Sequence, residues 1–172
     1  MTFLDHGSGP GFFINQVLAQ KCIAVDADAT NVKYIRKDIE FLNVKAQNLE
    51  FIPDNSVDLI FSSNLFEHLS SNYDLFEVLQ SAHHVMKKGN SKMVVLMPNI
   101  RFAKWDFFNF IDHRLPLNEI SLKEALEISN FEILSSHRKF FPYSADRSVI
   151  NSPIFVVKAY LSLSPKMRPF AK

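Results

Sequence analysis

The chain alternates between short apolar runs, which predict strands, and longer stretches with apolar residues at helical spacing, which predict helices. The predicted strands lie at residues 2–5, 22–25, 43–49, 57–62, 93–97 and 131–136. The predicted helices lie at residues 11–20, 30–41, 73–86, 101–111, 121–128 and 154–163. Strands that alternate with helices in this way indicate an α/β fold with a doubly wound sheet.

The composition favours one domain over residues 1–172, with an aromatic-rich insertion at about residues 100–118. The 19 basic and 18 acidic residues nearly cancel, so no nucleic-acid partner is expected. The single cysteine, Cys22, excludes an internal disulfide and fits a reducing compartment. No apolar run is long enough to span a membrane and no basic leader precedes Phe3, so we expect a cytoplasmic protein without a transmembrane segment.

Three of the four glycines, Gly7, Gly9 and Gly11, lie within five residues, between the first predicted strand and the first predicted helix. Such a cluster predicts a tight loop that a ligand approaches closely. In α/β sheets this strand–loop–helix arrangement holds nucleotide-like ligands. The dinucleotide fingerprint would place its third glycine at position 12, which is Phe12, so a nicotinamide-dependent oxidoreductase is disfavoured.

Three acidic residues lie close to this loop in the predicted fold. Asp26 follows the second predicted strand, where an acid can accept two hydrogen bonds from a ribose diol. Asp28 competes for that role, although its position before Thr30 favours an N-cap of the next helix. Asp5 is a candidate for a structural acid that holds the amides of the glycine loop.

Several segments together resemble the class I S-adenosylmethionine-dependent methyltransferases over residues 2 to about 99. The segments occur in the family's order and are Leu4–Gly11, Ala24–Asp26, Pro53–Ser63, Phe66–Leu69, His84–Gly89 and Met97–Asn99. The resemblance implies a Rossmann-like, mostly parallel sheet of seven strands and S-adenosylmethionine as the cofactor. The family's glycine loop lies along the methionine part of the cofactor, and its second-strand acid, here Asp26, binds the ribose.

The resemblance also implies a set of cofactor contacts: Asp5, Gly7, Ser8, Gly9, Gly11, Asp26, Ala27, Gln47 and Asn64. The adenine side departs from the family, because the stretch Val44–Leu49 lacks the acid that usually holds the adenine amino group. Gln47 or Asn48 could accept that hydrogen bond instead. Alternatively neither does, and the affinity for the cofactor is modest.

Transfer from a sulfonium needs mainly positioning, and a general base is needed only where the acceptor loses a proton. Candidate groups, Glu67 among them, follow the fourth and fifth predicted strands. His113 and His68 are the candidate proton acceptors. The alternative for His113 is a structural, hydrogen-bonded histidine, and the alternative for His68 is a first-turn or packing histidine. The candidate substrate contacts are Asn99, Arg101 and Trp105, from an insertion that either covers an acceptor pocket or packs on the sheet as an ordinary helix. No metal site is predicted.

The chain is also similar to a bacterial subgroup of these methyltransferases, some of which are associated with sugar or glycan modification. The predicted function is methyl transfer to a small-molecule or glycan-type acceptor; the alternative is a catalytically impaired cofactor-binding or structural domain. Neither the family's N-terminal helix nor its seventh strand is evident, so either the chain is truncated at both ends or another element replaces the strand. Truncation would make residues 154–163 a candidate homo-oligomer contact, with a membrane surface as the alternative.

Overall fold

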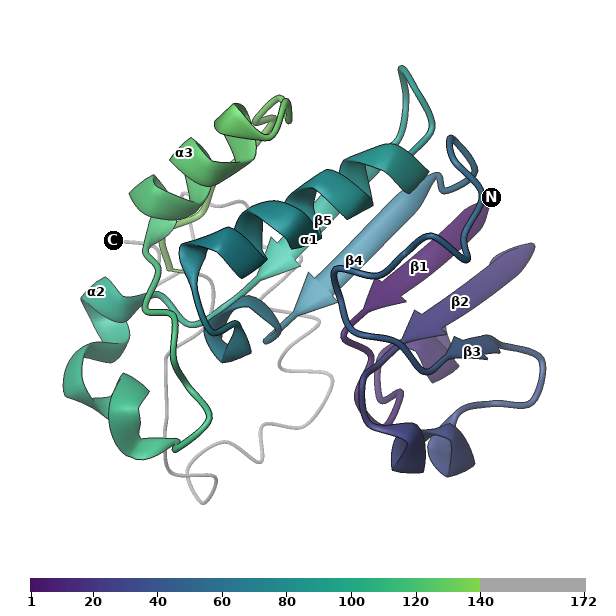
Figure 1. Cartoon of the computed structure of the whole chain (residues 1–172), viewed down its shortest axis with the longest axis horizontal. Coiled ribbons are helices and arrows are strands. Elements are labelled where there is room, and N and C mark those ends of the chain that lie inside the picture. Colours follow the sequence, from purple (N-terminus) through teal and green to yellow (C-terminus); the bar gives the residue numbers. More distant parts are fainter. Residues whose placement is uncertain (140–172) are drawn as a thin grey trace, which may run out of the picture.

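A five-stranded parallel sheet forms the centre of the molecule, whose computed structural model describes residues 1–139. The strands are β1 (Thr2–His6), β2 (Lys21–Val25), β3 (Glu40–Leu42), β4 (Leu59–Ser63) and β5 (Lys92–Leu96). Their order in the sheet is β3-β2-β1-β4-β5, and every neighbouring pair is parallel (Figure 1). The Rossmann-like prediction is therefore confirmed. The order reverses between β1 and β4, which makes the carboxyl ends of these two strands the topological switch point.

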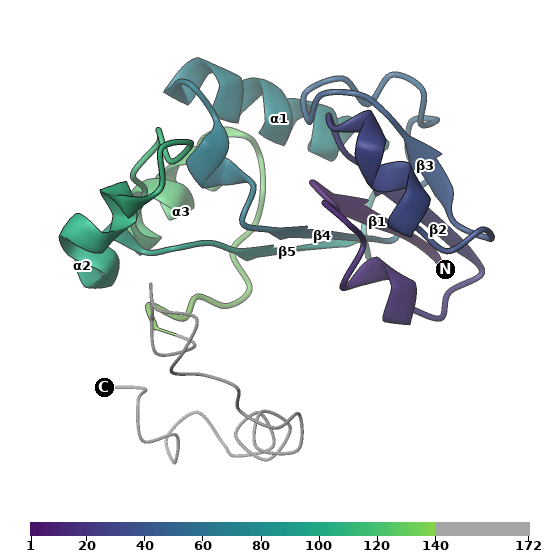
Figure 2. The same cartoon turned by 90° about the horizontal axis from the view of Figure 1, so that it is seen from below.

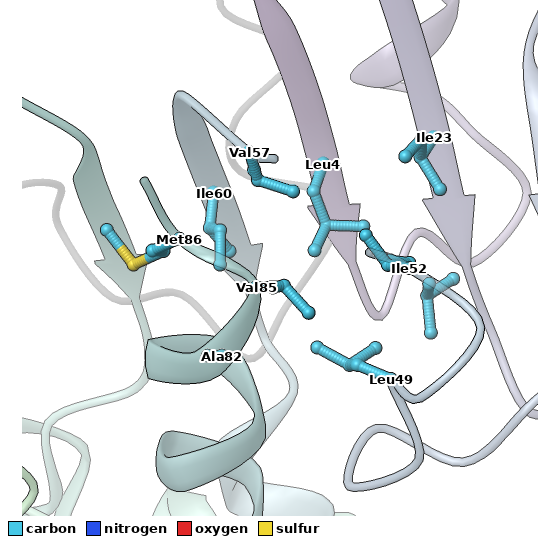
Figure 3. Close-up of a cluster of buried hydrophobic side chains, with 10 residues drawn as sticks. Leu4, Ile23, Leu49, Ile52, Val57, Ile60, Ala82, Val85 and Met86 are labelled. Carbon is cyan, nitrogen blue, oxygen red and sulfur yellow. The ribbon is translucent and has the colours of Figure 1, made fainter. Parts of the chain in front are cut away.

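One face of the sheet is covered by α1 (Asn72–Val85), which lies across it (Figure 2). Successive strand residues point to opposite faces, so Leu4 and Ile60 face α1 while Phe3 and Phe61 face away. The α1 face holds the core shown in Figure 3. Its labelled members are Leu4, Ile23, Leu49, Ile52, Val57, Ile60, Ala82, Val85 and Met86.

The opposite face carries a smaller cluster over β1 and β2. Among the described residues its only helical cover is η1, a 3₁₀ turn at Ile14–Gln16, which lies below the sheet in Figure 2. Phe13 stacks on Phe61 with ring centroids 4.0 Å apart. Val94 on β5 is 47% exposed, so the cover given by residues 1–139 stops short of β5 on this face.

The predicted helix at 11–20 is wrong, because only Ile14–Gln16 is helical there. Arg36 supplies the physical reason. Its guanidinium donates to the Asn15 carbonyl at 2.7 Å and to the Val17 carbonyl at 3.3 Å, so these oxygens are satisfied without a helix. The apolar spacing was misleading, since Phe12 and Leu18 are 80% and 90% exposed.

The predicted helix at 30–41 is also wrong. A 3₁₀ segment, η2 (Ala29–Tyr34), takes its first half and ends where Ile35 becomes extended. The apolar residues after it lie partly in a turn and partly in β3. The third strand therefore covers Glu40–Leu42 and none of the predicted residues 43–49.

The later elements agree better with the sequence. The predictions for β4, α1 and β5 are confirmed to within a few residues. The insertion folds as α2 (Ile100–Ala103) followed by the 3₁₀ segment η4 (Lys104–Asn109), beyond β5 in Figure 1. The next helix is α3 (Glu119–Ile128), which begins two residues before the predicted start at residue 121 and has Asn118 as its N-cap.

Two predicted elements near the C-terminus have different outcomes. Residues 131–136 form no strand; instead, the Phe131 ring packs edge-on against His83 of α1, with centroids 5.4 Å apart. The predicted helix at 154–163, and with it the proposed oligomer contact, lies outside the described residues. No helix within residues 1–139 has the length and apolarity to cross a membrane.

Candidate functional site

The glycine loop crosses from the end of β1 over the end of β2. The backbone N–H groups of Gly7 and Ser8 both donate to the Val25 carbonyl at 2.9 Å. Gly7, Gly9 and Gly11 have φ values of +79°, +50° and +74°, which side-chain-bearing residues rarely adopt. The loop is therefore built on three left-handed glycines, as their clustering predicts.

The surroundings of the three glycines differ. A Cβ atom at Gly7 would lie 3.0 Å from the Leu65 side chain, and one at Gly11 would lie 2.5 Å from Ile35 Cδ1. A Cβ at Gly9 would meet nothing within 4 Å. Gly7 and Gly11 thus serve close packing, whereas Gly9 leaves open space above the backbone where a ligand could approach.

Asp26 is the acid that holds the glycine loop. Its Oδ2 accepts from the Gly9 backbone N–H at 2.7 Å, and its Oδ1 accepts from the Asp28 N–H at 2.9 Å and from Asn31 Nδ2 at 3.0 Å. A carboxylate offers about four lone-pair positions, so capacity remains for a ribose hydroxyl. Asp28 is the N-cap of η2, because its side chain accepts a hydrogen bond from the Thr30 N–H. This confirms the N-cap interpretation of Asp28.

Asp5 does not hold a glycine amide. Its side chain is buried at 3% exposure and its hydrogen bond is with the backbone of Ile14, beyond the loop. Burial raises the pKa of Asp5 to about 7; the bond to Ile14 opposes this and the Asp26 charge adds to it. Next to it, burial lowers the pKa of His6 to about 4, and this ring bonds the Ala46 carbonyl at 2.7 Å.

The residues predicted for the adenine side lie after β3. Gln47 lines a hollow of about 270 Å³ against α1, together with Ser81 and His84, and no residue of the glycine loop lines that hollow. Because β3 ends at Leu42, the first polar residue after it is Asn43. The Asn43 side-chain amide donates to the carbonyls of Asp26 and Ala27, both at 3.0 Å. The position of Asn43 beside Asp26 and Ala27 could have been predicted only if the end of the third strand had been placed at Leu42.

The end of β4 brings polar groups beside the glycine loop. Asn64 has a left-handed φ of 52°, and its N–H bonds the Leu96 carbonyl at 2.9 Å. After this turn comes η3 (Phe66–His68), which carries Glu67 into the interior at 2% exposure. Burial raises the pKa of Glu67 to about 7, while the neighbouring His68 opposes the shift.

The loop after η4 brings His113 to Glu67. The Glu67 carbonyl accepts from the backbone N–H groups of Arg114 at 2.7 Å and Leu115 at 3.1 Å. The His68 and His113 rings meet edge to face with centroids 5.2 Å apart. Burial lowers the pKa of His113, as does the charge of His68. The structure therefore brings the two predicted histidines together, and Glu67, which precedes His68 in η3, lies close to both.

The predicted substrate contacts lie elsewhere on the insertion. Asn99 Nδ2 donates to Glu119 Oε2 at 2.7 Å, and Arg101 pairs with Glu119 Oε1 at 2.6 Å, so both side chains fasten the start of α3. Trp105 is 84% exposed and lines a hollow of about 270 Å³ with Ile100, Lys104 and Phe108. It is connected to the histidine cluster by a row of ring contacts, Trp105–Phe108–Phe107–His113.

The parallel sheet has a glycine loop at the switch point after β1 and an acid after the neighbouring β2. These features define an α/β protein that binds a nucleoside-type cofactor. The family model of the methyltransferase domain matches residues 4–93, which is 90 of the 172 residues. The chain therefore belongs to the methyltransferase domain family. This membership makes it a methyltransferase with S-adenosylmethionine as its cofactor. The open space at Gly9 beside Asp26 fits such a group.

Solved structures support the same fold. A SAM-dependent methyltransferase from Archaeoglobus fulgidus matches with a TM-score of 0.65 and 24% identity, over 92% of this chain and 76% of that one. A SAM-dependent methyltransferase from Thermotoga maritima matches with a TM-score of 0.65 and 18% identity, over 77% of this chain and 64% of that one.

A third structure is a methyltransferase from Haloferax volcanii in complex with the Trm112 methyltransferase activator. It has a TM-score of 0.63 and 16% identity, over 74% of this chain and 60% of that one. The chain thus spans less than two thirds of the Thermotoga and Haloferax proteins. No match was found among curated proteins.

Proposed function

We propose that the chain transfers a methyl group from S-adenosylmethionine to a small-molecule or sugar-type acceptor bound beside Glu67, His68 and His113. The observation that carries this proposal is the contact between the two halves of the site. Leu65, just ahead of η3, lies so close to Gly7 that a Cβ there would be 3.0 Å from it. The glycine loop after β1 and the histidine cluster after β4 are therefore adjacent, as transfer between two bound molecules requires.

On the cofactor side, we assign the backbone of Gly7, Ser8 and Gly9 to the methionine part, and Asp26 with Ala27 to the ribose. The open space at Gly9 and the spare acceptor capacity of Asp26 support this assignment. When bound, S-adenosylmethionine supplies a methyl group on a positively charged sulfur, so the protein needs chiefly to position the acceptor and exclude water.

The remaining cofactor residues have supporting positions. Asp5 and Gly11 stabilise the loop from its buried side, through Ile14 and Ile35 respectively. Asn64 lies in the turn directly after β4 and is proposed to contact the cofactor from there. Gln47 stays a prediction for the adenine contact, and Asn43 is a second candidate because it already bonds the Ala27 carbonyl.

On the acceptor side, His113 and His68 are proposed to receive the proton of an acceptor hydroxyl. His113 Nδ1 is buried and has no hydrogen-bond partner among residues 1–139. The rings of Phe107 and Phe110 hold the imidazole from two sides, with centroids 4.7 and 4.8 Å away. The ring row to Trp105 supports an apolar wall for the acceptor, whereas Asn99 and Arg101 are already engaged by Glu119 and reach an acceptor only if those bonds open.

The test has two stages. Calorimetry with S-adenosylhomocysteine should show binding to the full chain and loss of that binding in Asp26→Ala. Release of S-adenosylhomocysteine is then measured with sets of small hydroxylated molecules and of glycans, and we expect turnover with members of one set. Cofactor binding without turnover on any acceptor would instead favour a catalytically impaired domain, and absence of cofactor binding would remove both functions.

A further inference from the structure

Glu67, His68 and His113 form a cluster of the kind that holds a metal ion. One ligand-type atom from each side chain, a carboxylate oxygen or a ring nitrogen, lies within 4.8 Å of the other two. Glu67 and His68 come from η3 and His113 from the loop after η4, and the two segments are joined by the backbone bonds from Arg114 and Leu115 to the Glu67 carbonyl. The cluster is therefore held together independently of its side chains.

The Glu67 carboxyl is the unusual member of the cluster. It is 2% exposed, and its Oε2 has no hydrogen-bond partner among the described residues. A buried carboxylate without a partner is costly, and none of the ion pairs within residues 1–139 involves Glu67. The guanidinium of the nearby Arg114 turns to Ser70 Oγ, 3.4 Å away. The site thus holds a buried carboxyl that pairs with no lysine or arginine among residues 1–139.

His113 adds a second unsatisfied atom. Its Nδ1 is buried without a partner among the described residues, and rings of Phe107 and Phe110 fix the imidazole on the protein side. A neutral imidazole nitrogen and a carboxylate oxygen are ligands that Zn²⁺ and neighbouring divalent ions bind well. Two polar atoms that are orphaned in the protein alone would both be satisfied by one ion.

His68 carries the orienting contact found around metal-binding histidines. Its Nδ1 lies 3.3 Å from the Asp112 carboxylate and 3.3 Å from the Asp112 carbonyl. A ring nitrogen that bonds a carboxylate fixes the tautomer and turns the other nitrogen toward a metal. Asp112 directly precedes His113, so the same loop supplies one ligand and orients another.

We propose that Glu67, His68 and His113 bind a divalent ion of the Zn²⁺ class. Two imidazoles and one carboxylate form a ligand set that leaves a coordination position open. An acceptor oxygen in that position would lose its proton to water more easily, because a bound ion lowers the pKa of its oxygen ligand. The oxygen would then take the methyl group as its bond to sulfur breaks, with S-adenosylhomocysteine as the leaving group. This role rests on the proposed function: His68 and His113 then act on the acceptor through the ion rather than as free bases. Ion binding itself does not rest on it.

The binding test uses the full chain, stripped of metal by a chelator and titrated with Co²⁺, whose visible absorption reports its ligands. We expect saturable Co²⁺ binding that Zn²⁺ displaces. Glu67→Gln and His113→Gln should each weaken binding by at least about tenfold. The matched control, His84→Gln, changes an exposed histidine of α1 and should leave the titration unchanged. Failure of Co²⁺ and Zn²⁺ to bind at millimolar concentration, or equal binding by both cluster variants and wild type, overturns the proposal.

Glu67→Gln and His113→Gln change interior groups, so a second measurement guards against misfolding. His68 is more exposed, and His68→Gln should abolish the rise in melting temperature that Zn²⁺ causes in the wild type. An unchanged rise in this variant also contradicts the proposal. Calorimetry with S-adenosylhomocysteine in the presence of chelator tests the proposed function separately. Cofactor binding without ion binding removes only the metal site, and ion binding without cofactor binding removes only the proposed function.

Discussion

The Asp26 carboxylate accepts a hydrogen bond of 2.7 Å from the backbone N–H of Gly9, and this bond ties the end of β2 to the glycine loop that follows β1. One side chain therefore fixes the loop and faces the space above Gly9, where a Cβ would meet nothing within 4 Å. If Asp26 binds the ribose as proposed, loop geometry and cofactor recognition are coupled through this side chain. Substitutions here should change binding through both effects.

Asp26→Ala should weaken S-adenosylhomocysteine binding by about ten- to a hundredfold, measured by calorimetry. The reason is the loss of an ionised acceptor, whose hydrogen bonds contribute roughly 1.5–3 kcal/mol each. Asp38→Ala is the control, because Asp38 is an exposed acid that pairs with Arg36 and is not part of the proposed site. Equal affinity of Asp26→Ala and wild type would show that Asp26 does not face the cofactor.

Alanine at Gly9 and at Gly11 should have different effects. Both residues have positive φ, which costs an alanine roughly 1–2 kcal/mol. At Gly11 the new Cβ would also lie 2.5 Å from Ile35 Cδ1, and such overpacking costs about 1–3 kcal/mol more. Denaturant unfolding should therefore show Gly11→Ala to be the less stable variant, whereas calorimetry should show that Gly9→Ala loses cofactor affinity. Greater destabilisation by Gly9→Ala would contradict this view of the loop.

Asp5→Asn should become more stabilising relative to wild type as the pH rises. The folded-state pKa of Asp5 is about 7 and its unfolded value is about 3.9, so the folded protein favours the protonated form. The wild type therefore loses stability between about pH 4 and pH 7, by up to about 1.4 kcal/mol per pH unit. An asparagine at this position does not titrate and avoids that loss.

The measurement is the free energy of unfolding in denaturant for both proteins at several pH values across this window. The opposite contribution of His6, whose folded pKa is about 4, is present in both proteins and cancels in the difference. Asp38→Asn serves as control: Asp38 is exposed and its pKa is lowered by Arg36, so its difference from wild type should be flat above pH 5. A flat difference for Asp5→Asn as well would show that its carboxyl is not held in its neutral form.

Asn99→Ala should lower the stability of the protein by about 1–2 kcal/mol, as expected for a lost N-cap. Its Oδ1 accepts from the Arg101 N–H at 3.0 Å at the start of α2, and its Nδ2 reaches Glu119 at the start of α3. Thermal unfolding measures the effect, with Asn109→Ala as control because the Asn109 side chain makes one long contact, 3.4 Å to Asp106. Unchanged stability of Asn99→Ala would show that these bonds do not hold the side chain, and Asn99 would then be free to contact the methyl acceptor.

The sequence by itself determined the central strands, α1 and the glycine loop. The buried parallel strand β4 begins with the apolar run Leu59–Phe61, and α1 shows helical spacing over fourteen residues, so both are decided by local pattern. The loop is equally local, because only glycine adopts its three positive φ values easily. Asp26 could be predicted because the end of its strand is visible in the sequence.

Only the tertiary structure decided the connections and the polar cluster. Residues 11–20 have helical spacing, but Arg36 from another segment satisfies their carbonyls and removes the need for helical bonds. Glu67 and His113 are far apart in the chain, and they meet because Arg114 and Leu115 bond the Glu67 backbone. Local patterns carry no information about such long-range bonds. For this reason the sequence placed Glu67 among the candidate groups after the fourth strand but predicted neither its burial nor its approach to His113.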